Sequence, residues 1–98
     1  MRVKNMTSAK TGRSVPNQFV IEHDDGKTRT RYFQSYQTII VKDVLEYAEG
    51  QMWKTYLDKY KWNCSRTTSK YRNQFLDETT KETKKKIKSG EYILADLN

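Results

Sequence analysis

The sequence of 98 residues has only one cysteine, one histidine, one proline and four glycines. Cys64 forms no disulfide within the chain, and together with His23 it supplies too few ligands for a structural zinc site. The four glycines form no glycine-rich loop of the kind that binds phosphate groups. We therefore expect a protein without a metal ion or another cofactor.

Long apolar segments are also missing. No run of about 18 apolar residues occurs, so no segment is expected to span a membrane. The N-terminal segment Met1–Met6 has no apolar stretch behind its charged residues and does not resemble a signal peptide. These features indicate a cytoplasmic protein without a membrane partner.

Basic residues are in excess and lie mainly near the two ends of the chain. The sequence has 19 Lys and Arg against 12 Asp and Glu, which gives a net charge of +7. Residues 1–16 hold four basic residues and no acidic ones, residues 17–64 hold seven of each sign, and residues 65–98 hold eight basic and five acidic. This asymmetry favours an acidic partner such as nucleic acid.

The N-terminal segment differs in composition from the rest. Residues 1–17 are polar, include Gly12 and Pro16, and show no apolar period. This pattern predicts a basic flexible arm over residues 1–17, followed by a single folded domain over residues 18–98.

A β-hairpin is predicted at the start of the folded domain. Residues 19–23 alternate between two faces and contain β-branched residues, which favours a strand. The sequence Asp24-Asp25-Gly26 is typical of a hairpin turn, and residues 28–36 alternate again as the returning strand.

Residues 37–61 fit two patterns. The β-branched cluster Thr38–Val41 favours extended chain, whereas other apolar residues recur at helical spacing. The helical set is Ile40, Val41, Val44, Leu45 and Ala48. We favour a second hairpin through Glu49 and Gly50, with a strand over 51–57, and keep a helix as the alternative for residues 38–50.

A helix is predicted over residues 65–77. Ser65 is a good N-cap, and Tyr71 and Phe75 lie one turn apart on the face that is expected to meet a sheet.

A second, shorter helix and a closing strand complete the chain. Thr79 and Glu82 form a capping-box signature, and Gly90 is suited to end the second helix. Residues 91–95 are typical of a strand. The predicted fold is α+β, a small and mostly antiparallel sheet packed by one or two C-terminal helices.

Several stretches resemble a family of small bacteriophage proteins. They are FQSYQTII at residues 33–40, YLD at residues 56–58, SRTTSKYRNQFL at residues 65–76 and ETTKETKKKIKSGEY at residues 78–92. The resemblance covers most of residues 17–97 and implies a phage origin and a location in the host cytoplasm. Because that family is uncharacterised, the resemblance implies no activity and no site.

The first predicted helix carries side chains of the kinds that contact base edges and phosphates in the major groove. These candidates are Arg66, Lys70, Arg72, Asn73 and Gln74. No turn-helix signature precedes them. The alternative interpretation is the solvated outer face of an amphipathic helix.

The second helix adds lysines that would neutralise phosphates without reading the base sequence. They are Lys81, Lys84, Lys85 and Lys88, and Arg13 in the predicted arm is a further candidate. The alternative interpretations are solubility and complementation of the helix dipole for the lysines, and an idle tail for Arg13.

Aromatic residues alternate with basic ones in the middle of the chain, an arrangement that could stack single-stranded bases. The aromatic set is Tyr32, Phe33, Tyr36, Tyr56, Tyr60 and Trp62, and the basic set is Arg29, Arg31, Lys59 and Lys61. The same rings are the large side chains available to fill a core that is poor in leucine. We favour the core interpretation.

Catalysis has little support. The acidic residues beside His23 lie in the predicted turn, where Asp side chains commonly bind backbone N–H groups rather than a metal ion. Cys64 has no histidine near it in the sequence, so a structural thiol is favoured over a nucleophile. We expect no enzymatic activity.

These observations lead to two hypotheses. The first is a small non-catalytic phage accessory protein that binds DNA or RNA through a basic surface. The alternative is a host-takeover or anti-defence inhibitor that binds a host protein. The nucleic-acid type and the oligomeric state stay open, since the exposed edge of a small sheet could pair with a second copy.

The two hypotheses make different structural predictions. Nucleic-acid binding predicts that the basic residues of the two helices lie on one face of the fold. A protein inhibitor predicts an exposed apolar patch around Trp53, Tyr56 or Trp62.

Overall fold

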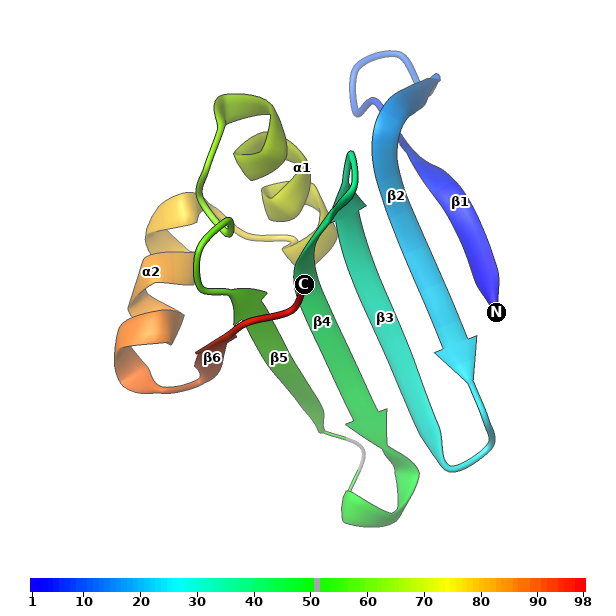
Figure 1. The fold of residues 1–98 in the computed structure, drawn as a ribbon, viewed down its shortest axis with the longest axis vertical. Coiled ribbons are helices and arrows are strands. Elements are labelled where there is room, and N and C mark those ends of the chain that lie inside the picture. The colour runs from blue at the N-terminus through cyan, green and yellow to red at the C-terminus, as the bar shows by residue number, and fades with distance from the viewer. Residues whose placement is uncertain (51) are drawn as a thin grey trace.

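Within residues 1–50 and 52–98, which the computed structural model describes, six strands form one sheet in their order along the chain (Figure 1). The strands are β1 (Arg2–Thr7), β2 (Ser14–Asp24), β3 (Thr28–Ser35), β4 (Thr38–Glu46), β5 (Trp53–Asp58) and β6 (Tyr92–Ala95). The first five strands are antiparallel, and β6 pairs in parallel with β5. Two helices, α1 (Arg66–Leu76) and α2 (Thr80–Ser89), connect these two strands. The predicted α+β class is confirmed.

The N-terminal segment belongs to the sheet, so the prediction of a flexible arm over residues 1–17 is wrong. β1 pairs with β2 from Arg2 opposite Glu22 to Asn5 opposite Phe19. Met6 is buried in the core, and the side-chain amide of Asn5 donates a hydrogen bond to the carbonyl oxygen of Val15. An edge strand can form without an apolar period because backbone hydrogen bonds to its neighbour supply much of its stability.

Both predicted hairpins are present. In the first turn, the backbone N–H of Gly26 donates to Asp24 and that of Thr28 donates to Asp25, as expected for Asp residues that serve the backbone. β4 and β5 form the second hairpin, which confirms the strand interpretation of residues 38–46. A single 3-10 turn at Tyr47–Glu49 precedes Gly50, and the first residue of the predicted strand 51–57 lies outside the described residues.

The helix boundaries follow the predicted caps. The Ser65 hydroxyl accepts a hydrogen bond from the backbone N–H of Thr68 at the start of α1. Thr79 and Glu82 form a complete capping box at the start of α2. Gly90 ends α2 with φ of 86°, in the left-handed region that favours glycine.

The core lies between the sheet and the two helices. Phe33 of β3 is fully buried, and its ring lies 5.9 Å from that of Phe75 of α1. Tyr71 joins the same cluster, so the predicted contact of Tyr71 and Phe75 with the sheet is confirmed. A buried phenylalanine contributes about 1.5–3 kcal/mol, so a few large rings compensate for the scarcity of leucine.

One face of the sheet faces away from the helices. Ile87 of α2 packs against the same core as Phe75 of α1, so both helices lie on one side of the sheet, and Figure 1 shows them at its β5–β6 end. Alternation along β3 places Phe33 towards the helices and Tyr32 on the other side. We call this second side the open face. Neither helix is long and apolar enough to cross a membrane, nor is any other helix in the described chain.

Candidate nucleic-acid interface

Four lysines form one stripe along the outer side of α2. They are Lys81, Lys84, Lys85 and Lys88, and all four are exposed. Their spacing of three, four and seven residues places them on one side of a helix. Thr83, on the opposite side, is fully buried. We call the four residues the lysine stripe; no ion pair involves them within the part of the chain that the structure describes.

The remaining lysine of this run has a structural role. Lys86 Nζ lies 2.8 Å from Oε1 of Glu78, whose side chain is almost fully buried between the helices. Glu78 also accepts hydrogen bonds from the hydroxyls of Thr83 and Tyr92. This network connects α2 to β6, so the opposite side of α2 faces solvent.

The pKa values within this network reflect the pairing. Burial by itself would raise the pKa of Glu78, but the hydrogen bonds from Lys86, Thr83 and Tyr92 outweigh it and hold the pKa below its ordinary value. The same carboxylate raises the pKa of Lys86. Lys86 is therefore committed to Glu78, and the lysine stripe consists of four residues rather than five.

The predicted contacts of α1 divide into two groups. Arg66 and Lys70 are exposed and lie one turn apart. The side-chain amide of Asn73 donates to Thr80, and that of Gln74 donates to the carbonyl oxygen of Thr7, so both are used within the protein.

Arg72 is fully buried, so its prediction as a nucleic-acid contact is wrong. Its guanidinium donates to the carbonyl oxygen of Trp62 at 2.6 Å and to Asn73 and Thr80 at 2.9 and 2.8 Å. It also stacks over the Trp62 ring. Arg72 lies on the inner side of α1 with Thr68 and Phe75, at spacings of four and three residues. This helical spacing is the sequence feature that indicates the burial of Arg72.

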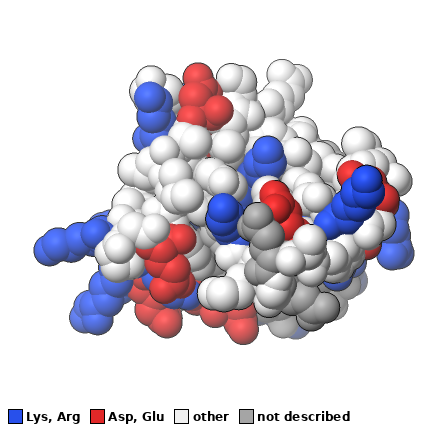
Figure 2. Space-filling view, turned by 90° about the horizontal axis from the view of Figure 1, so that it is seen from below, with Lys and Arg blue, Asp and Glu red and all other residues white. Residues whose placement is uncertain are grey.

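The structure separates Arg13 from the lysine stripe. Arg13 is exposed in the turn between β1 and β2, whereas α2 packs against β6 at the opposite edge of the sheet. Figure 2 shows basic side chains projecting on the side where α2 lies in Figure 1, with acidic side chains beside them. Basic side chains also appear at the centre and on the other side of this view, so basic charge is not confined to the helices.

The aromatic residues have several different environments, so the core interpretation applies to only some of them. Phe33 belongs to the core, and Trp62 packs against it. Tyr36 and Tyr60 are exposed at 57% and 68%. Tyr32 and Tyr56 are half-buried on the open face, outside the core cluster.

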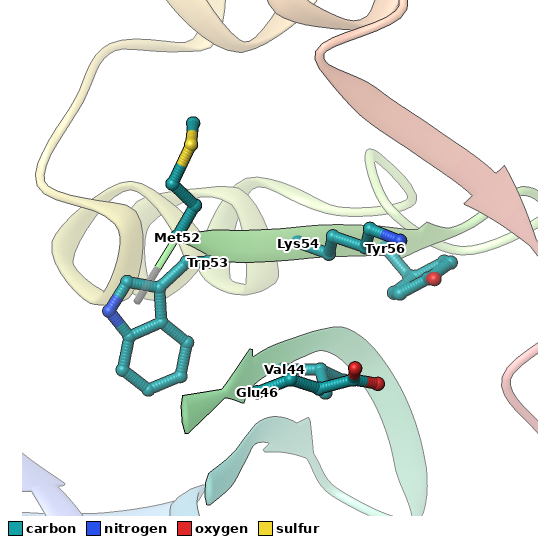
Figure 3. A pocket seen from close by; sticks show the side chains of 6 residues that line it. All are labelled: Val44, Glu46, Met52, Trp53, Lys54 and Tyr56. Carbon is teal, nitrogen blue, oxygen red and sulfur yellow. The ribbon is translucent and has the colours of Figure 1, made fainter. Parts of the chain in front are cut away.

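A hollow of about 290 Å³ lies where β4 meets the start of β5 (Figure 3). It is lined by Val44, Glu46, Met52, Trp53, Lys54 and Tyr56. Met52 is 78% exposed, and the side chains of Met52 and Trp53 point in different directions from the start of the strand (Figure 3). The guanidiniums of Arg29 and Arg31 lie 5.9 and 5.6 Å from the Trp53 ring. Met52 and Trp53 are exposed apolar side chains of this hollow, and the charged residues Glu46 and Lys54 line it beside them.

The candidate catalytic residues are not brought together. Cys64 is exposed, and His23 lies at the far end of β2. Across residues 1–50 and 52–98, no three His, Cys, Asp or Glu side chains form a group that could hold a metal ion.

Comparison with known proteins places the chain in a family. Residues 1–91 match a family of unknown function, DUF8033. The chain belongs to this family. No curated protein and no solved structure matches it. The match establishes membership of the DUF8033 family, and inferences about a partner or an activity therefore rest on the geometry of the surface.

Proposed function

We propose that this DUF8033 protein is a small non-catalytic protein that binds nucleic acid through the lysine stripe, with Arg66 and Lys70 as further phosphate contacts. The observation that carries this proposal is the stripe itself, four exposed lysines on one side of a helix that Lys86 and Glu78 anchor to the sheet. Lysine ammonium groups neutralise phosphates and release bound counterions, which drives association.

Four basic residues, two on each helix, are exposed and available to bind phosphate groups. Arg66 and Lys70 of α1, and Lys84 and Lys85 of α2, extend from two helices that share one side of the sheet. This arrangement supports a common phosphate-binding surface. We further propose a phage origin and action in the cytoplasm of the host, on the basis of the sequence resemblance.

The test is fluorescence anisotropy with labelled duplex DNA, single-stranded DNA and RNA at about 50–200 mM salt. Over this range, an affinity that depends on counterion release falls steeply as the salt concentration rises. With about five phosphate contacts, affinity for duplex DNA should fall roughly 10²- to 10³-fold over this range. The double variant Lys84→Glu/Lys85→Glu should bind at least tenfold more weakly, since it reverses two charges of the stripe.

A matched control separates position from net charge. Lys10→Glu/Lys27→Glu makes the same change in net charge at two exposed turn residues away from α2. If both double variants lose affinity equally, the stripe is not a site and the proposal fails. The proposal also fails if the wild-type protein binds nucleic acid only at the lowest salt concentration.

The hollow beside β5 favours a second candidate, a protein that binds and inhibits a host protein. Met52 is the most exposed apolar side chain of that hollow, and Trp53 lies next to it. Exposed aromatic and methionine side chains are common at the centres of interfaces. A stoichiometric host complex seen by native mass spectrometry, lost in Met52→Glu and kept in Lys84→Glu/Lys85→Glu, would support this candidate over nucleic-acid binding.

A further inference from the structure

One row of side chains crosses the open face through all six strands. Strand register pairs Tyr32 with Lys42 and Lys42 with Tyr56. Residues paired directly across neighbouring strands share one face of the sheet. The row continues to Val3 and Ile21 on one side and to Ile93 on the other. A lysine therefore lies between two tyrosines at the centre of the face.

The spacing of this row suits an extended strand of nucleic acid. Neighbouring strands lie about 4.8 Å apart, so the two tyrosines are separated by roughly 10 Å, with the lysine midway. Two rings at this distance can each stack on a base while an ammonium group between them reaches a phosphate.

The three side chains are available for contact. Tyr32, Lys42 and Tyr56 are half-buried rather than buried, and both helices lie on the other side of the sheet. In the described part of the chain, neither the Tyr32 nor the Tyr56 hydroxyl has a hydrogen-bond partner. Lys42 forms no ion pair with the described residues.

Two hollows extend the face at its ends, and aromatic side chains line both. One, of about 490 Å³, is lined by Asn17, Phe19, Tyr36, Gln37 and Thr38. The other is the 290 Å³ hollow that Tyr56 and Lys54 line in Figure 3. Aromatic rings are thus distributed along the face from one hollow to the other.

The charges of the face favour an anionic occupant over a second copy of the chain. Lys42 and Lys54 lie on it. Two carboxylates of the described β4 and β5 residues alternate onto the same side, of which Glu46 is exposed and Asp58 is buried. A twofold stack of two copies centred on this row would bring the two Lys42 ammonium groups together, and like charges at the centre of an interface are unfavourable.

We propose that the open face binds single-stranded nucleic acid, with bases stacked on Tyr32 and Tyr56 and a phosphate at Lys42. This inference rests on the proposed function and assigns its substrate class. Bases inside a duplex are stacked on one another and offer no free ring surface, so duplex DNA contacts only the basic residues of α1 and α2. The protein is thereby selective for single strands.

The test compares Tyr32→Leu/Tyr56→Leu with Tyr32→Phe/Tyr56→Phe. Leucine keeps an apolar side chain on the sheet and removes the ring, whereas phenylalanine keeps the ring and removes only the hydroxyl. The leucine variant should bind single-stranded DNA about tenfold or more weakly, because each stacked base contributes substantially to affinity. Its duplex affinity should be unchanged, and the phenylalanine variant should bind both strands like the wild type.

A second measurement locates the contact directly. Single-stranded DNA that contains 5-iodouracil is photocrosslinked to the wild-type protein, which is then digested with trypsin. Tyr32 lies in the tryptic peptide of residues 32–42 and Tyr56 in that of residues 55–59. Adducts on these two tyrosines support the proposal. Adducts confined to α1 or α2 would overturn it.

The outcomes separate this inference from the proposed function. If the leucine variant binds single strands like the wild type while Lys84→Glu/Lys85→Glu does not, the stripe is a site and the open face is not. If the wild type binds no nucleic acid, both proposals fall. If the wild type forms a dimer that the leucine variant loses without a change in single-strand affinity, the open face is a self-association surface and the inference is wrong.

Discussion

Lys86 Nζ lies 2.8 Å from Oε1 of Glu78, and this contact connects the charged helix α2 to the interior of the fold. The two partners differ in environment, since the side chain of Glu78 is 2% exposed and that of Lys86 is 36% exposed. Lys86 thus covers a buried carboxylate, while the stripe on the other side of the helix carries the charges that face solvent.

Removal of the Glu78 charge should destabilise the protein. Glu78→Gln keeps the size of the side chain but weakens the hydrogen bonds to Lys86, Thr83 and Tyr92, so we expect a loss of about 1–3 kcal/mol in the free energy of unfolding. Urea denaturation measures this loss. Glu91→Gln is the matched control, because Glu91 lies 3.8 Å from the same ammonium but is 62% exposed. Equal effects of the two variants would contradict a special role for Glu78.

Glu78 should also affect how the free energy of unfolding depends on pH in the acidic range. Its pKa in the folded protein lies below the ordinary value of 4.5, so the carboxylate contributes stability that is present at neutral pH and is lost as the pH falls through the folded pKa. Glu78→Gln should therefore show a flatter decrease in the free energy of unfolding below about pH 4.5 than the wild type. Denaturant midpoints measured from pH 7 to pH 3 check this, and parallel curves for the two proteins would refute it.

Arg66 and Arg72 should respond in opposite ways to the same substitution. Arg72→Met removes a fully buried guanidinium and leaves acceptors such as the Trp62 carbonyl without their donor, so the free energy of unfolding should fall by about 2–4 kcal/mol. Arg66→Met alters an exposed side chain, so stability should change by less than about 0.5 kcal/mol while nucleic-acid affinity falls. Thermal melts and anisotropy on both variants decide the matter. A loss of affinity without a loss of stability in Arg72→Met would contradict the burial argument.

The salt dependence should report the lysine stripe quantitatively. Each phosphate contact contributes about 0.9 to the slope of log affinity against log salt for duplex DNA. Lys84→Gln/Lys85→Gln should therefore reduce the slope by about 1.8, whereas Lys10→Gln/Lys27→Gln should leave it unchanged. Titrations at four or more salt concentrations give both slopes, and an unaltered slope in the first variant would show that the two lysines touch no phosphate.

Local features of the fold could be predicted from sequence because their causes lie within a few residues. The Asp24-Asp25-Gly26 turn, the Ser65 cap and the Thr79–Glu82 capping box all depend on hydrogen bonds between near neighbours. The lysine stripe follows from helical spacing alone once the helix is predicted.

Long-range pairing explains what sequence reasoning missed. Residues 2–7 have no strand pattern of their own, yet β2 provides backbone partners for them. The sequence pattern does not distinguish Lys42, because its segment fits both a strand and a helix. Its position between Tyr32 and Tyr56 depends on the register of three strands.

The α+β class, the caps of both helices and the positions of the lysines around α2 follow from local sequence, because they depend on backbone geometry and short-range hydrogen bonds. The burial of Arg72 and the common row of Tyr32, Lys42 and Tyr56 on the open face become visible in the folded protein. The physical reason is that burial and strand register are set by contacts between residues far apart in the chain, which helix packing and sheet pairing bring together.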